Sequence, residues 1–117
     1  MSIRAAILGL ATLVSVSLPA SAARLLGDGS ISCEAWTQER EVNSARSSLM
    51  TVWVLGFVSA ANVTLFARGD PDFLADSNID IRGVVDNMVD YCQAHPDRRI
   101  ADAAGDLVIN LLKKARN

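Results

Sequence analysis

Residues 47–67 read SSLMTVWVLGFVSAANVTLFA, and no side chain in this stretch carries a charge. Two apolar stripes run through it at helical spacing: Leu49, Trp53, Gly56, Phe57 and Ala60 form one, and Met50, Val54, Val58, Ala61 and Leu65 form the other. A helix that is apolar around most of its circumference is either the central helix of a bundle or a membrane span. The stretch therefore predicts one long helix around which the fold is built.

Two observations favour the bundle helix over the membrane span. The polar residues Thr51, Ser59, Asn62 and Thr64 interrupt the apolar run, and polar residues weaken insertion into a bilayer. A membrane span would also place Cys33, which precedes this stretch, and Cys92, which follows it, on opposite sides of the membrane, where they could not pair. We therefore expect a buried helix, and no stable membrane span in the mature chain.

Three further helices are expected around this one. Ser30 or Ser32 is a candidate N-cap for a helix over 33–40. A third helix is expected over 81–94, with Ile81 on its buried face, and a fourth follows with Pro96 as its first residue. No segment alternates apolar and polar residues with period two, so the fold class predicted is all-α, a small four-helix orthogonal bundle.

The first 22 residues have the three parts of a secretory signal peptide. Arg4 gives a cationic start, an apolar run extends to Leu18, and Pro19-Ala20-Ser21-Ala22 ends with small residues. Cleavage after Ala22 would leave a flexible lead over 23–31 and a single helical domain over 32–117. We expect the mature chain to be exported to the periplasm, where thiols oxidise.

The mature chain has two cysteines, Cys33 and Cys92. Two cysteines in an exported chain most simply form one structural disulfide, and the C-x-x-C spacing typical of a redox-active pair is absent. The disulfide would join the start of the first helix to the end of the third.

The sequence contains no constellation typical of an enzyme, a metal site or a cofactor site. The one histidine, His95, precedes a proline at a helix boundary. Asp76, Asn78 and Asp80 match positions 1, 3 and 5 of a calcium loop, but positions 6 and 12 are Ile81 and Asn87 instead of Gly and Glu. The mature chain has ten basic and thirteen acidic residues, and this balance argues against a nucleic-acid partner.

Three short motifs resemble the HdeA/HdeB group of small exported bacterial proteins: Cys33-x-x-Trp36, Trp53-x-x-Gly56-Phe57, and Tyr91-Cys92-x-x-His95-Pro96. This resemblance implies an all-helical fold with one disulfide between an early and a late helix. It also implies an acid-stress chaperone of the holdase type, which binds unfolding clients through apolar helix surface. Trp53 and Phe57 are the candidate client-binding residues on the central helix.

A second similarity, an aromatic-Gly helix, is to the Tai-type immunity proteins of type VI secretion. It implies the alternative function, an inhibitor that binds a secreted cell-wall-degrading effector. The acidic loop over 69–80 is the candidate surface for such a partner, with Phe73 and Leu74 as apolar anchors. Under either hypothesis the partner is a protein, and a homodimer is a further expectation.

Overall fold

The protein folds as a bundle of helices in the computed structural model, which describes residues 23–117. The expected signal peptide, residues 1–22, lies outside the described residues. A short 3-10 helix, η1 (Gly27–Ser30), precedes five α-helices, which are α1 (Cys33–Glu41), α2 (Ala45–Ala67), α3 (Phe73–Ser77), α4 (Ile81–Ala94) and α5 (Ile100–Arg116). No β-strand occurs between residues 23 and 117, so the all-α prediction is confirmed.

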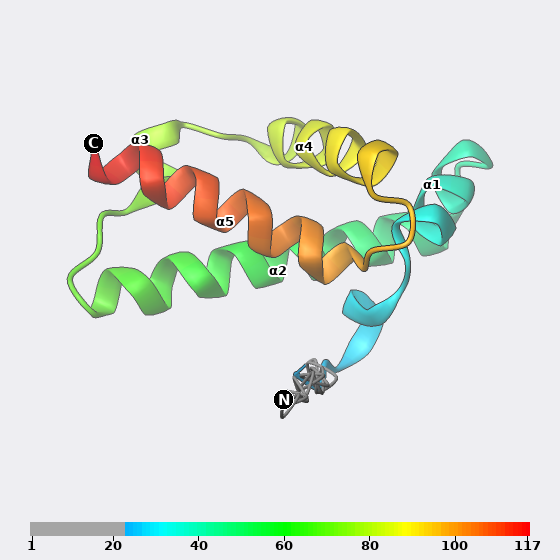
Figure 1. Ribbon diagram of the computed structural model, residues 1–117, viewed down its shortest axis with the longest axis horizontal. Coiled ribbons are helices and arrows are strands. Elements are labelled where there is room, and N and C mark those ends of the chain that lie inside the picture. Colours follow the sequence, from blue (N-terminus) through cyan, green and yellow to red (C-terminus); the bar gives the residue numbers. More distant parts are fainter. Residues whose placement is uncertain (1–22) are drawn as a thin grey trace, which may run out of the picture.

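The three longest helices run lengthwise in Figure 1, and α5 contacts both α2 and α4. The polypeptide direction reverses between α2 and α4 and again between α4 and α5, while α1 packs at the end where α2 begins. The short helix α3 lies beside the last turns of α5. The bundle therefore has five helices instead of the four expected, and its long helices run lengthwise past one another.

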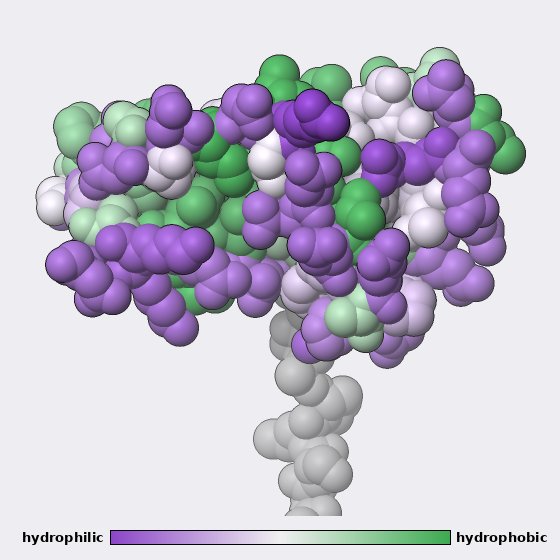
Figure 2. Space-filling view, turned by 90° about the horizontal axis from the view of Figure 1, so that it is seen from above, coloured by the Kyte–Doolittle hydropathy of each residue, from purple (hydrophilic) through white to green (hydrophobic). Residues whose placement is uncertain are grey.

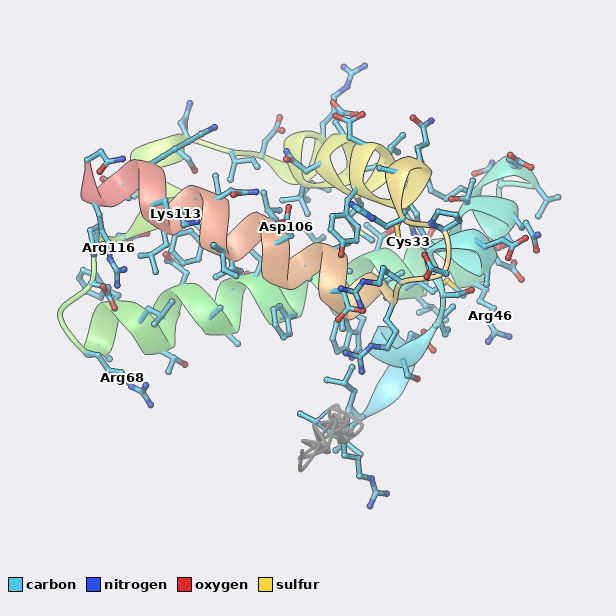
Figure 3. The ribbon with its side chains drawn as sticks, viewed as in Figure 1. Cys33, Arg46, Arg68, Asp106, Lys113 and Arg116 are labelled. Atoms are coloured by element: carbon cyan, nitrogen blue, oxygen red, sulfur yellow. A yellow bond between two sulfur atoms is a disulfide. The ribbon has the colours of Figure 1, made fainter. Side chains whose placement is uncertain are left out.

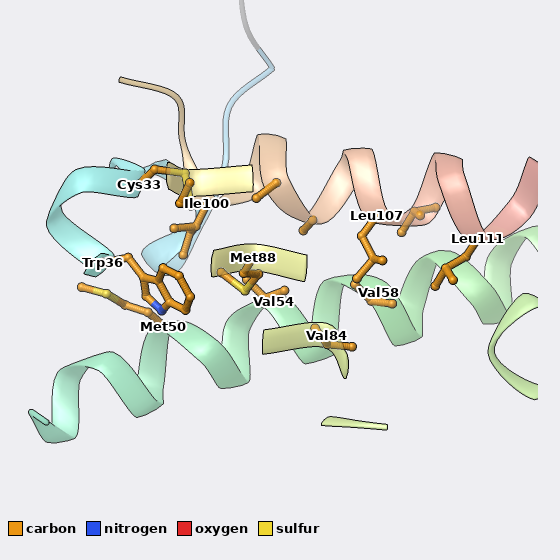
Figure 4. Packing of buried hydrophobic residues seen from close by; sticks show 14 of the residues in the cluster. Cys33, Trp36, Met50, Val54, Val58, Val84, Met88, Ile100, Leu107 and Leu111 are labelled. Atoms are coloured by element: carbon orange, nitrogen blue, oxygen red, sulfur yellow. A yellow bond between two sulfur atoms is a disulfide. The ribbon is translucent and has the colours of Figure 1, made fainter. Parts of the chain in front are cut away.

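The buried core follows one stripe from each long helix. Trp36 and Met50 fill the end beside α1, and Val54, Met88 and Leu107 continue the core along the bundle (Figure 4). Apolar residues recur every three or four positions on α4 and α5, which is the spacing that keeps one face of a helix against its neighbours. One predicted core residue is misplaced: the side chain of Ile81, in the first turn of α4, is 65% exposed.

Cys33 and Cys92 form a disulfide, as predicted. Their Cα atoms are 4.9 Å apart, and both side chains are buried beneath α1 and the last turn of α4. The linkage ties together two helices separated by 59 positions in the sequence.

The ends of the helices show which of the predicted helix boundaries are correct and which are wrong. The Ser32 hydroxyl accepts a hydrogen bond from the Ala35 N–H (3.1 Å), so Ser32 is the cap of α1. Pro96 is not the first residue of the last helix: α5 begins at Ile100, after a turn over residues 95–98. The Asp102 carboxylate accepts a hydrogen bond from the Arg99 N–H (3.0 Å) and fixes the N-terminus of α5 at this position. The helix therefore does not begin earlier, at Pro96.

The segment over 69–80, expected to be a loop, contains α3. Asp72 caps this helix by accepting the Ala75 N–H (3.0 Å), and Asn78 ends it in the left-handed conformation. A helix of five residues is too short to show an apolar period, so only its capping aspartate could have predicted it.

Candidate functional site

The structure places only one side of α2 in the core, although the sequence predicts a helix buried around most of its circumference. The buried residues of α2 are Ser47, Met50, Val54, Val58 and Asn62. Among the described helices, α2 alone is long and apolar enough to cross a membrane, yet only 22% of its most apolar 18-residue stretch is buried. The prediction of a buried central helix is therefore wrong for half of α2.

Between Leu49 and Phe66 the exposed side of α2 is uncharged and largely apolar, and we call it the α2 face. It consists of Leu49, Val52, Gly56, Ser59, Ala60, Val63 and Phe66. Four of the eight large apolar side chains exposed in residues 23–117 belong to it: Leu49 (64% exposed), Val52 (61%), Val63 (66%) and Phe66 (59%). A contiguous apolar patch of this kind is typical of an interaction surface.

Arginines mark the two ends of the α2 face. Figure 3 shows Arg46 and Arg68 at opposite ends of α2, with Lys113 and Arg116 of α5 near the Arg68 end. Helix α5 contacts α2 and carries Asp102 and Asp106 on its length. A bilayer that enclosed α2 would have to enclose this charged helix as well, which is unfavourable. The arrangement is consistent with the absence of a stable membrane span.

The two aromatic residues expected to bind clients lie at the edge of the α2 face. Trp53 and Phe57 are stacked, with ring centroids 5.5 Å apart, and both are only partly exposed. The Trp53 indole donates a hydrogen bond from Nε1 to the Leu26 carbonyl oxygen (2.8 Å), and it covers Gly29 of η1. Trp53 therefore holds the segment expected to be a flexible lead against α2.

The two loop residues expected to anchor a partner are also part of the packing. Phe73 is completely buried, with 0% exposure, and Leu74 is partly buried against the core. In this conformation Phe73 is not available to a partner. Sequence reasoning missed the exposed residues of α2 because a stripe that faces solvent and a stripe that faces the core have the same composition here.

A polar contact at the far end of α2 fixes the loop that carries Phe73. The Asn62 amide donates to an Asp72 carboxylate oxygen (2.8 Å) and accepts the Leu74 N–H (3.3 Å). Asn62 is 8% exposed. Because its side chain is buried and hydrogen-bonded, the Asn62-Val63-Thr64 sequon is not an accessible glycosylation site in this fold.

Hydrogen bonds lower the pKa values of two of the carboxylates that cap helices, Asp72 and Asp102. The pKa of Asp72 lies below its ordinary value chiefly because the Ala75 N–H and the Asn62 amide donate to the ionised form. The pKa of Asp102 is lowered chiefly by a hydrogen bond from the Arg99 side chain. The N-terminal caps of α3 and α5 thus both depend on an ionised aspartate.

The remaining hollows are open grooves between helices. Figure 2 looks onto the α4 side of the bundle, where hydrophobic surface shows between bands of hydrophilic side chains. One groove is lined by Leu107 and Leu111 of α5, by Ile79 and Asn87, and by the charged side chains of Asp76 and Lys114. Between residues 23 and 117, no three His, Cys, Asp or Glu side chains are grouped closely enough to hold a metal ion.

Comparison with known proteins gives no relative. No protein-family model matches the chain, and neither a curated protein nor a solved structure matches it.

Proposed function

We propose that this protein is an exported helical chaperone of the holdase type, which binds unfolding proteins through the α2 face in the periplasm. The observation that carries the proposal is the exposure of Leu49, Val52, Val63 and Phe66 on one helix whose stretch 47–67 carries no charge. Unfolding proteins expose apolar segments without a fixed shape. A long apolar surface free of charge binds such segments without demanding a particular sequence.

Three features support the proposed location and client class. The leader has the composition of a signal peptide, the disulfide is compatible with an oxidising compartment, and the motifs around Trp36, Trp53 and Cys92 resemble those of the HdeA/HdeB group. Each is consistent with an acid-stress role.

Acid would change the charge of the molecule in a direction that favours opening. At pH 2–3 most of the thirteen carboxylates of the mature chain would be protonated, since ordinary carboxyl pKa values lie near 4. The net charge would then swing from −3 to roughly +12, and like charges on a compact chain repel one another. The caps at Asp72 and Asp102 would weaken in the same range of pH.

The immunity function remains the alternative proposal, with a changed surface. Because Phe73 is buried, an inhibitor of this fold would bind its effector through the α2 face and not through a Phe73 anchor. A holdase protects several unrelated clients, whereas an inhibitor binds one enzyme tightly at neutral pH. Measuring the aggregation of two unrelated periplasmic clients distinguishes the two functions, because only a holdase would protect both clients.

The decisive variant is Val52→Ser/Val63→Ser. We expect the wild-type mature chain to suppress client aggregation at pH 2.5, and this variant to need several-fold more protein for the same suppression. The matched control is Val42→Ser/Ile81→Ser, since Val42 (73%) and Ile81 (65%) are similarly exposed but lie outside the α2 face. Equal activity of the two double variants, or an inactive wild type, would overturn the proposal.

A further inference from the structure

The groove between α5 and the segment from α3 to α4 carries opposite charges at one end and apolar side chains along its length. Its α5 side consists of Leu107, Asn110, Leu111 and Lys114, which recur every three or four positions and so share one face of the helix. We call it the α5 groove. Among the described residues that line it, none belongs to α2. A ligand bound here is therefore separate from the α2 face and from the proposed function.

Two opposite charges lie at the same end of the α5 groove. Lys114 belongs to the last turn of α5, and Asp76 belongs to α3, which lies beside the last turns of α5. Both side chains are exposed. Between residues 23 and 117 the ion pairs are formed by other residues, so neither Asp76 nor Lys114 is paired with an opposite charge within the protein. Both charges are therefore available to a ligand.

Apolar side chains form the rest of the α5 groove. Leu107 and Leu111 belong to the core, and Ile79 is partly buried against it. From Leu107 to Lys114 the helix rises roughly 10 Å, at about 1.5 Å per residue. The groove has a volume of about 410 Å³, and sites for small molecules have volumes of about 300–1,000 Å³. Its size and lining suit a small ligand with an apolar body and a charged head.

We propose that the α5 groove binds a free α-amino acid with a large apolar side chain. The ammonium group of the ligand pairs with Asp76, its carboxylate pairs with Lys114, and its side chain lies on Leu111 and Leu107. A peptide long enough to fill the groove would carry its two terminal charges roughly 10 Å apart, since one extended residue spans about 3.5 Å. A free amino acid carries both charges at one end, as the groove does.

Small amphiphiles with a single charge fit the α5 groove less well. A fatty acid would pair with Lys114, but it would leave Asp76 without a partner and bring a second negative charge next to it. An amine would leave Lys114 without a partner in the same way. Because an exposed ion pair has a modest effect on affinity, we expect the loss of either charge to weaken binding about three- to fivefold.

The first test is an NMR titration of the mature, disulfide-bonded chain with L-phenylalanine at neutral pH. We expect the side-chain amide signals of Asn87 and Asn110, which line the groove, to shift in a saturable way. The expected dissociation constant is on the order of 1 mM, as for a ligand of few atoms. The signals of Val52 and Val63 on the α2 face should not move. The result therefore does not depend on whether the chain is a holdase.

The second test assigns each charge by pairing variants with analogues. Asp76→Asn should weaken the binding of phenylalanine about three- to fivefold but leave that of N-acetylphenylalanine, which has no ammonium group, unchanged. Lys114→Gln should weaken phenylalanine by a similar factor and leave phenylalaninamide, which has no carboxylate, unchanged. The matched controls are Asp86→Asn and Lys113→Gln, which remove the same charges from exposed positions that do not line the groove.

Three results would overturn the proposal. The first is the absence of a saturable shift at Asn87 and Asn110. The second is tighter binding of N-acetylphenylalanine than of phenylalanine, which would assign the groove to the C-terminus of a peptide. The third is an equal effect of the groove variants and their controls, which would mean that neither charge contacts the ligand. Circular dichroism checks that all four variants fold.

Discussion

At the scale of single residues, Gly29 shows how a small side chain positions the N-terminal segment. A Cβ atom built on Gly29 would lie 2.3 Å from two ring atoms of Trp53. The contact allows η1 to lie flat on the indole, with Leu26 placed to accept its hydrogen bond. The absence of a side chain at Gly29 therefore allows η1 to pack closely on α2.

Replacing Gly29 with alanine should displace η1. We expect the free energy of unfolding to fall by about 1–3 kcal/mol, as in other overpacked sites, and the Trp53 indole N–H to exchange faster with solvent. Gly56→Ala is the matched control and should be neutral or stabilising, because a Cβ there meets nothing within 4 Å. An unchanged indole signal in Gly29→Ala would contradict the packing described for Trp53.

Sequence reasoning was most accurate for residues whose role is chemical and local. The pairing of Cys33 with Cys92 and the cap at Ser32 follow from what those side chains can bond. It was weakest for Phe73 and Ile81, because burial depends on which elements meet. Phe73 is buried by α3, which the sequence pattern did not reveal, and Ile81 lies exposed at the start of α4.

At the scale of elements, α3 and α5 are both held at their N-termini by aspartates. Lowered pKa values mean that Asp72 and Asp102 stay ionised in the folded state at a pH where they would be protonated in the unfolded chain. Their stabilising contribution is present above the unfolded pKa, near 4. It is lost as the pH falls through the lower, folded pKa values.

The pH dependence of stability should therefore depend on these two caps. We expect the unfolding free energy of the wild type to decline steeply below about pH 4, and Asp72→Asn/Asp102→Asn to show a smaller decline from a lower starting value. Asp76→Asn/Asp106→Asn is the control, since neither carboxylate caps a helix. Urea unfolding between pH 2 and 7 measures the difference, and parallel curves for wild type and the cap variant would contradict it.

The helices themselves were largely predictable, and their exposure was not. The third predicted helix, over 81–94, coincides with α4, because its start at Asp80 and its stop before Pro96 are local signals. Helix α2 was predicted within two residues at its start. Its half-exposed state could not be predicted, since the surrounding helices are too few to cover a helix of that length on every side.

At the scale of the whole molecule, one disulfide closes a large part of the chain. Cross-linking residues 59 positions apart reduces the entropy of the unfolded chain, and the chain-entropy model gives about 4 kcal/mol for such a loop. The link joins α1 to α4 at the end of the bundle where the core holds Trp36 and Met50.

Removing the disulfide should therefore destabilise the fold more than the loss of a single helix cap. Cys33→Ser/Cys92→Ser is expected to lower the unfolding free energy by about 2–4 kcal/mol, which corresponds to a fall in Tm of roughly 10–20 °C for a domain of this size. The reduced wild type serves as a comparison, since it loses the bond but keeps the sulfur atoms in the core. A change of less than about 1 kcal/mol would show that the link constrains little of the unfolded chain.

The central claim is that the α2 face is where this protein meets other proteins, and site-specific photo-cross-linking in the cell envelope tests it most directly. A photoreactive residue replaces Val52 in one strain and Ile81 in another, two positions of similar exposure on different helices. The account predicts adducts with client proteins from position 52, and few from position 81. Adducts of equal yield from both positions, or none from position 52, would contradict it.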